Sequence, residues 1–363
     1  MNNMIICLGG AGCNCAKEIV KRSSLSDVNV YAVDSVTSHI DLETINKINF
    51  ISIISDEKNG SGRNRERAQA MYSYHEEGGS FGQMYKDAVD AKAPVVVITS
   101  AAGGTGSGSV VPLCEALISR GVQVIPIIIC PNMADPIAYH LNTNDLMIEL
   151  REVGIETYSI FRNSRGDADY TPVNNEVVDL IEIIFGKKYG TTNLDSIDDS
   201  DLDVVLNTPG RFIAVSASAN DVNTLKKELT RKVLSGSQPA WTEEESENHT
   251  FMTAYSLTSM FAESDFKTVF SEINSRIKNV YDEYRNICVE DNNGSANATL
   301  IVAGLPRAEV KIIDTDFKEA NSIAEGLNKS KRPKFMNRKK AVVTEETAEH
   351  SVEGSAIKKF NWV

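Results

Sequence analysis

The sequence predicts an α/β protein that begins with a Rossmann-like domain built on a parallel sheet. Apolar runs with the length and composition of buried strands lie at 4–8, 28–33, 94–99 and 121–129. Helical patterns alternate with these runs, which is the order typical of parallel sheets. Glycine-rich turns follow two of the strands, at 9–14 and 101–108. Such turns between a strand and a helix suit the binding of an anion.

Length and composition favour a two-domain globular protein and argue against a membrane protein or a nucleic-acid-binding domain. A chain of 363 residues is long enough for two packed domains. Its net charge of −13 argues against nucleic-acid binding by the folded body. No apolar run reaches the length of a membrane span and no basic leader precedes the first strand, so the sequence predicts a cytoplasmic protein. Its six cysteines and five histidines lack the spacing of a metal site.

The segment 101–108 has the composition of a phosphate-binding loop. Its glycines let backbone N–H groups and the N-terminus of the next helix approach an anion closely. It lacks the lysine of a P-loop and the GxGxxG spacing of a dinucleotide fold. The residues predicted to surround the phosphates are Ala102, Gly103, Gly104, Thr105, Gly106 and Ser107.

The run GGTGSG at 103–108 resembles the signature phosphate loop of the tubulin/FtsZ superfamily of GTPases. Further segments resemble the family's motifs in the same order, over roughly residues 1–305. The resemblance implies a GTPase that binds GTP or GDP with Mg²⁺. The implied parts are a GTP-binding domain (1–168), a long central helix with an acidic catalytic loop (169–204), a smaller mixed α/β assembly domain (205–305) and a helix with a charged C-terminal tail (306–363).

The turn at 9–14 resembles the first nucleotide loop of the family, although it is one glycine poorer. The resemblance implies that Gly10, Gly12 and Cys13 lie near the phosphates and Asn14 near the sugar or base. Ala11 belongs to the same predicted site. A strand followed by glycines and a helix also opens a dinucleotide-binding fold, so this turn alone leaves both interpretations open.

Three later loops supply further candidates. Asp34 ends a predicted strand, where an acidic residue reaches a ribose in either fold. Gly60 and Arg63 match the family's loop for the terminal phosphate, where Arg63 or Arg65 would pair with phosphate oxygens. A solvated basic turn is the alternative for this loop. The resemblance also implies that Asp135 contacts the ribose.

The predicted central helix begins near Pro172, a residue that suits a first helical turn. The resemblance implies that Tyr170 stacks on guanine and that Asn174 reads its edge, with Asn175 as a fallback. The four-residue spacing places Tyr170 and Asn174 on one helix face. An ordinary capped helix start remains the alternative interpretation.

The segment 193–203 contains five aspartates. A solvated loop would explain them, but the family carries an NxDxxD-like loop here that enters the nucleotide site of the next subunit and positions the attacking water. Two alignments fit: one selects Asp195 and Asp198, the other Asp198 and Asp201. Asp198 occurs in both. The resemblance therefore implies head-to-tail filaments whose assembly activates hydrolysis.

The second half is predicted to contain strands at 211–216, 250–260 and 297–304 and helices at 223–234, 266–288 and 314–328. The segment 329–340 then carries seven basic residues and no acidic one. Such an arm either keeps the chain soluble or binds an acidic partner.

Together these features predict a GTP-dependent, filament-forming GTPase. The divergent first loop and charged tail resemble the plasmid and phage TubZ and PhuZ branches, which implies DNA segregation or positioning, with a DNA-bound adaptor on the tail. The alternatives are a division protein of FtsZ type, a non-hydrolysing nucleotide-binding scaffold and an NAD-dependent oxidoreductase. The oxidoreductase would leave the second glycine-rich segment and the acidic run unused.

Overall fold

A computed structural model describes residues 3–54, 60–91, 93–132, 134–163, 169–186, 199–238, 252–258, 263–276, 280–288 and 296–305. The predicted catalytic residues Asp195 and Asp198 lie outside this part of the chain. So do the predicted helix 314–328 and the basic segment 329–340.

The strands of the described residues form a sheet of ten in the order β3-β2-β1-β4-β5-β6-β7-β10-β8-β9. All neighbours from β3 to β7 run parallel, β10 is antiparallel to β7 and β8, and β9 is parallel to β8. The bounds are β1 (Met4–Leu8), β2 (Asn29–Asp34), β3 (Asn49–Ser52), β4 (Val95–Ser100), β5 (Val124–Cys130), β6 (Thr157–Arg162), β7 (Gly210–Ala219), β8 (Met252–Thr258), β9 (Asp282–Cys288) and β10 (Ala296–Leu305). The predicted α/β fold with a parallel N-terminal sheet is confirmed.

Helices cover both faces of the parallel strands. Their bounds are α1 (Gly9–Ile19), α2 (Leu42–Ile45), α3 (Arg65–Glu77), α4 (Gly82–Asp90), α5 (Thr105–Ile118), α6 (Ile137–Glu152) and α7 (Thr171–Ile181). One apolar cluster joins α1 and α7 to one face, and a second joins α4, α5 and α6 to the other. Because successive strand residues alternate between these clusters, β1 is buried along its whole length.

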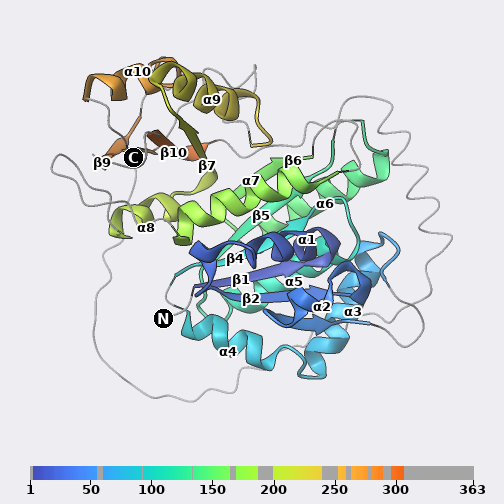
Figure 1. The fold of residues 1–363 in the computed structure, drawn as a ribbon. Coiled ribbons are helices and arrows are strands. Elements are labelled where there is room, and N and C mark those ends of the chain that lie inside the picture. The colour runs from blue at the N-terminus through green and yellow to red at the C-terminus, as the bar shows by residue number, and fades with distance from the viewer. Residues whose placement is uncertain are drawn as a thin grey trace, which may run out of the picture. The chain divides into compact units, whose positions relative to one another are not determined.

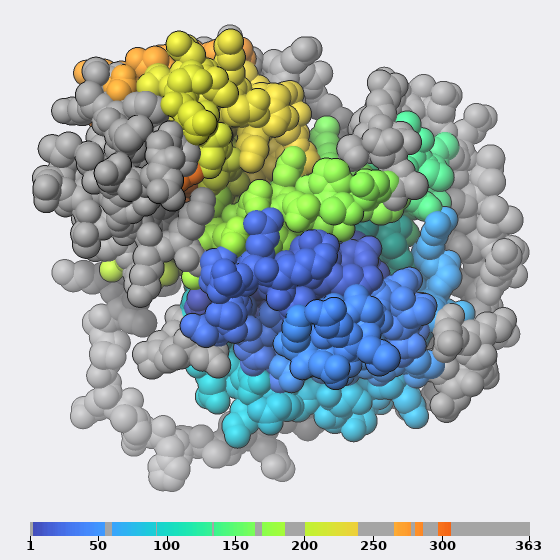
Figure 2. Space-filling model, in the orientation of Figure 1, coloured from blue at the N-terminus to red at the C-terminus, as the bar shows by residue number. Residues whose placement is uncertain are grey.

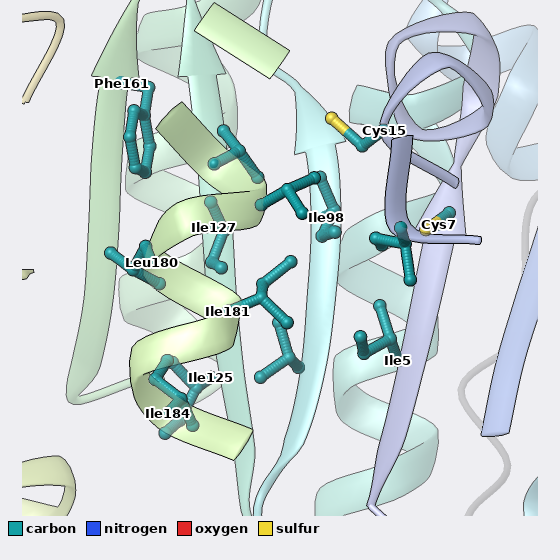
Figure 3. Packing of buried hydrophobic residues seen from close by; sticks show 14 of the residues in the cluster. Ile5, Cys7, Cys15, Ile98, Ile125, Ile127, Phe161, Leu180, Ile181 and Ile184 are labelled. Carbon is teal, nitrogen blue, oxygen red and sulfur yellow. The ribbon is translucent and has the colours of Figure 1, made fainter. Parts of the chain in front are cut away.

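The central helix α7 packs on the sheet beside α1 (Figures 1 and 2). It continues into a π-helical turn, Glu182–Gly186. In Figure 3, Leu180, Ile181 and Ile184 lie over the strands that carry Ile98, Ile125, Ile127 and Phe161, and all belong to one apolar cluster. These apolar side chains explain why the predicted helix is stable where it lies, because burial of each one is worth about 1.5–3 kcal/mol.

The second half adds α8 (Asp199–Asn207), α9 (Val222–Ser235) and α10 (Glu263–Asn274). A third apolar cluster joins α9 and α10 to β7 and β10. The predicted helix over 266–288 is wrong beyond α10, because β9 follows and pairs with β8. The helical spacing of apolar residues continues through Ile277, Val280 and Tyr284, so periodicity favoured a helix. Backbone pairing with the edge of β8 overrides it.

Among the described residues, no helix combines the length and the apolar character that crossing a membrane would require.

Candidate functional site

A cavity of about 460 Å³ lies where β1, β2, β4 and β5 end. This volume lies in the range of small-molecule sites, and the ends of parallel strands are where such sites form. The predicted residues that line it are Gly10, Ala11, Asn14, Asp34, Gly60, Arg63, Ala102, Gly103, Gly104, Thr105, Gly106, Asp135, Tyr170 and Asn174. The fold therefore gathers loops that are up to about 160 residues apart in the sequence into one cavity.

The two glycine-rich segments touch each other at this cavity. A Cβ atom on Gly9 would lie 2.7 Å from the backbone nitrogen of Gly106, and one on Gly106 would lie 2.8 Å from the carbonyl oxygen of Leu8. Helix α1 begins at Gly9 and α5 begins at Thr105, so both helices start inside the segments predicted as turns. Two helix N-termini therefore converge there, and their free N–H groups and dipoles favour an anion.

Gly12, Cys13 and Ser107, which the resemblance places near the nucleotide, do not line the cavity but support its walls. A Cβ on Gly12 would lie 2.7 Å from the backbone carbon of Cys7, so Gly12 allows α1 to pack against β1. The Cys13 thiol donates to Asp34 Oδ2 across 3.7 Å. The Ser107 hydroxyl donates to the Gly103 carbonyl across 2.6 Å, within the glycine-rich segment. Direct contact of these three with a ligand stays a prediction.

A cluster of hydroxyl groups ties three loops together beneath the cavity. Thr105 Oγ1 lies 2.7 Å from Ser35 Oγ and 3.1 Å from Ser61 Oγ. All three residues are buried. Nothing in the sequence marks Ser35 or Ser61 as site residues, because single serines carry no spacing signal. The cluster fixes the position of the helix N-terminus at Thr105 relative to both neighbouring loops.

Asp34 is buried and accepts several hydrogen bonds. Its carboxylate contacts the backbone N–H of Ser35 at 2.7 Å and Nδ1 of His39 at 2.6 Å. Burial, and secondly the Asp34 carboxylate, raise the pKa of the Cys13 thiol well above its ordinary value, so this thiol stays protonated and donates. His39 also lines the cavity and was not predicted. No motif marks an isolated histidine five residues after an aspartate.

The two arginines of the terminal-phosphate loop differ in their surroundings. Arg63 lines the cavity, and its guanidinium lies 4.7 Å from the centre of the Tyr139 ring. Arg65 is buried and contacts Glu149 at 2.8 and 3.0 Å. Arg63 is therefore the arginine available to a ligand. Tyr139 is a further lining residue that was not predicted.

Tyr170 and Asn174 also line the cavity and lie one helical turn apart. The backbone N–H of Asn174 donates to the Tyr170 carbonyl at 3.0 Å. Tyr170 is 49% exposed, whereas Asn174 is 7% exposed and accepts from the Cys15 thiol at 3.6 Å. An exposed ring beside a buried amide suits a planar base, because the ring offers a stacking surface and the amide a hydrogen-bonding edge. Asn175 does not line the cavity.

The loop after β5 is held by its own polar groups. Asp135, which lines the cavity, accepts from the backbone N–H of Asn132 at 2.7 Å, and the Asn132 amide donates to the Asn163 carbonyl at 3.1 Å. Asn163 also lines the cavity and was not predicted. Among the residues with described positions, no group of three His, Cys, Asp or Glu that could hold a metal ion occurs.

No protein-family model and no curated protein matches the chain. Solved structures do match. The CetZ2 protofilament with bound GTPγS from Haloferax volcanii is 16% identical with a TM-score of 0.67, over 90% of this chain and 100% of that one. TubZ of Clostridium botulinum phage c-st is 13% identical with a TM-score of 0.63, over 91% and 100%. An empty FtsZ dimer from M. jannaschii is 14% identical with a TM-score of 0.63, over 86% and 95%.

The chain has the tubulin/FtsZ fold. Within this fold the glycine-rich segments, Tyr170 and Asn174 share the one cavity described above. Asp201, the predicted catalytic residue that lies in the described chain, is in helix α8 and is not among the residues lining the cavity. A catalytic role for Asp201 therefore requires either movement or a second subunit.

Proposed function

We propose that the chain is a GTPase of tubulin/FtsZ type that binds GTP in this cavity and assembles head to tail. The observation that carries the proposal is the cavity itself. The N-termini of two helices and the pair Tyr170 and Asn174 line the same cavity. Helix N-termini favour phosphates, and an exposed ring beside an amide suits a planar base, so a nucleotide, which carries both groups, matches this lining.

The phosphates are held by the backbone N–H groups of residues 9–12 and 103–107, which are numerous because both segments begin helices. Mg²⁺ would bind the phosphates and neutralise part of their charge. Because Mg²⁺ usually keeps several waters and takes few protein ligands, it would not need a cluster of carboxylates in the described lining.

Hydrolysis needs a water placed in line with the terminal phosphate. The cavity lining contains Asp34 and Asp135, but both carboxylates are engaged by groups of their own loops. We assign the positioning of the water to Asp198, with Asp195 or Asp201, of the next subunit. This arrangement makes hydrolysis depend on assembly and gives a heterologous contact, which produces open filaments.

The cargo is proposed to be plasmid or phage DNA, held through an adaptor on the basic segment 329–340. Two observations support this: TubZ of a phage is among the similar structures, and the segment is basic on an acidic protein. Pull-down of a DNA-bound adaptor by the full chain and not by a chain cut after Asn328 is the expected result. Equal capture by both overturns the role of the tail.

The deciding experiment measures GTP hydrolysis per subunit against protein concentration, for the wild type and Asp198→Ala. We expect the specific activity to rise steeply above a threshold concentration and the variant to sediment as filaments without turnover. Activity that is independent of concentration places all catalytic groups within one subunit and overturns the shared site.

Fluorescence titration with NADH against GTP tests the oxidoreductase alternative, and tight NADH binding would favour it.

A further inference from the structure

The backbone of the glycine-rich segment 101–108 differs in how its carbonyl oxygens and its N–H groups are engaged. The carbonyl of Gly104 accepts from the backbone N–H of Gly108 at 2.8 Å, and the carbonyl of Ser107 accepts from the Arg65 guanidinium at 3.3 Å. The N–H groups of residues 102–107, in contrast, donate to no group among the described residues. The donors of this segment are therefore free for a ligand, while its acceptors are held by the protein.

Helix α6 contacts this segment through the side chain of Asn142. The amide nitrogen of Asn142 lies 3.1 Å from the carbonyl oxygen of Ala102 and 3.3 Å from that of Gly103. It also lies 3.3 Å from the carbonyl oxygen of Arg63, in the loop before α3. An amide nitrogen only donates, so one group of Asn142 holds acceptors from two loops. Asn142 is not among the residues that line the cavity, so it acts on the segment from the protein side.

These contacts decide where the next N–H groups of the segment point. In a planar trans peptide, the carbonyl oxygen and the N–H of the following residue point in opposite directions. Asn142 holds the carbonyl oxygens of Ala102 and Gly103 toward α6, so the N–H groups of Gly103 and Gly104 point away from α6. Both glycines line the cavity. Two backbone donors are therefore directed to the place where an anion would bind.

The glycines make this orientation depend on an outside contact. A Cβ on Gly103 would meet nothing within 4 Å, and glycine itself restricts the neighbouring peptide planes very little. The carbonyl of Gly103 has a second donor, the Ser107 hydroxyl at 2.6 Å. The carbonyl of Ala102 has Asn142 as its one donor among the described residues. Loss of the Asn142 amide would therefore release the peptide between Ala102 and Gly103 first.

We propose that Asn142 is a positioning residue for nucleotide binding, which turns the peptide planes of the glycine-rich segment so that the N–H groups of Gly103 and Gly104 face the phosphates. This inference rests on the proposed function of the cavity. Donors that already point at the ligand need no reordering when it binds, so the contact lowers the cost of binding. The effect concerns the phosphates and not the base, because Tyr170 and Asn174 belong to α7.

The test measures the affinity of the full chain for GDP, GTPγS and guanosine, at a protein concentration below that of assembly. Calorimetry serves for the nucleotides and competition NMR for guanosine. In Asn142→Asp a carboxylate faces the three carbonyl oxygens and does not donate, so we expect both nucleotides to bind about 10- to 100-fold more weakly. The affinity for guanosine, which has no phosphate, should stay within about threefold.

Asn144→Asp is the matched control. It places the same charge on the same helix, and the Asn144 side chain contacts its neighbour Asp145 and not the glycine-rich segment. Its affinities should stay within about threefold of the wild type. Asn142→Ala adds no charge and keeps the test valid if Asn142→Asp does not fold; its nucleotides should bind about 3- to 10-fold more weakly. Asn142→Gln keeps the amide and should recover part of this loss.

The possible outcomes separate this inference from the proposed function. Unchanged nucleotide binding in Asn142→Asp and Asn142→Ala overturns the role of Asn142 and leaves the proposed function standing. An equal loss for guanosine and the nucleotides does the same, because Asn142 would then support the cavity as a whole. An equal loss in Asn144→Asp attributes the effect to charge alone and also overturns the inference. If the wild type binds neither GDP nor GTPγS, the proposed function and this inference fail together.

Discussion

Nδ1 of His39 lies 2.6 Å from Oδ2 of Asp34, whose side chain is 1% exposed. An ionised carboxylate only accepts, so Nδ1 carries the proton. The bond holds the ring against the first glycine-rich segment, because a Cβ on Gly10 would lie 3.0 Å from the same nitrogen. His39 therefore forms a wall of the cavity and supplies a hydrogen bond to a buried carboxylate.

Replacement of His39 by alanine should lower the free energy of unfolding by about 1–2 kcal/mol, because Asp34 loses one donor but keeps others. Asparagine places its amide near the Nδ1 position, so His39→Asn should recover part of this loss. Urea unfolding of the nucleotide-free protein measures both. An alanine variant as stable as the wild type would show that the bond contributes nothing to stability.

The glycine-rich segment contains a matched pair that separates folding from binding. A Cβ on Gly106 would lie 2.7 Å from Thr99 Oγ1, whereas one on Gly103 would meet nothing within 4 Å. Gly106→Ala should therefore destabilise the fold by about 1–3 kcal/mol. Gly103→Ala should leave stability nearly unchanged and weaken nucleotide binding, because its methyl group stands at the cavity. Thermal unfolding and GTPγS calorimetry on both variants test this, and the reverse pattern contradicts it.

Arg65 is 8% exposed and Glu149 is 32% exposed in their ion pair. Removal of the carboxylate leaves a buried guanidinium without its main acceptor. We expect Glu149→Ala to cost about 2–3 kcal/mol, below the range for fully buried pairs because Glu149 is partly exposed. Glu149→Gln keeps one acceptor and should cost less. If Glu149→Gln unfolds at the same urea concentration as the wild type, the charge of Glu149 is unimportant.

Burial raises the pKa of the Cys114 thiol to about 12, whereas an unfolded thiol titrates near about 8.5. At pH values between the pKa of the unfolded thiol and that of the folded thiol, the unfolded chain loses this proton and the folded chain keeps it. The thiol's contribution to stability is therefore complete at pH 8 and declines as the pH rises toward the folded value. Cys114→Ala should reduce the alkaline loss by up to about 1.4 kcal/mol per pH unit. Urea unfolding between pH 8 and pH 10 with reductant tests it, and unchanged slopes refute it.

Three variants can decide between the two alignments of the acidic segment 193–203 with the family's catalytic loop. Asp198→Ala should lower the rate of GTP hydrolysis by about 10²- to 10⁴-fold, the usual contribution of a group that handles a proton in the transition state. If the first alignment holds, Asp195→Ala is also inactive and Asp201→Ala is active; the second alignment gives the opposite. Full activity of Asp198→Ala in sedimentable filaments excludes both alignments.

The sequence by itself determined the parallel sheet and the cavity's outline. Strands buried on both faces must be apolar throughout, so β1, β4 and β5 are visible as continuous runs. Two backbones can approach this closely only where the residues are glycines, so the glycine-rich composition of both segments predicted the contact between Gly9 and Gly106. The sequence did not predict that α1 starts at Gly9 and α5 at Thr105, inside the glycine-rich segments. Glycine is a poor helix former, so its presence argued against a helix there.

Only the tertiary structure decided which polar side chains meet. Arg63 and Arg65 are two residues apart, but one lines the cavity and the other contacts Glu149, because α6 presents Tyr139 to one and Glu149 to the other. The contact of His39 with Asp34 likewise has no periodic signal. The strand β9 formed where spacing favoured a helix, since an open edge of β8 was available. Such outcomes depend on groups brought together by the fold, so local pattern does not encode them.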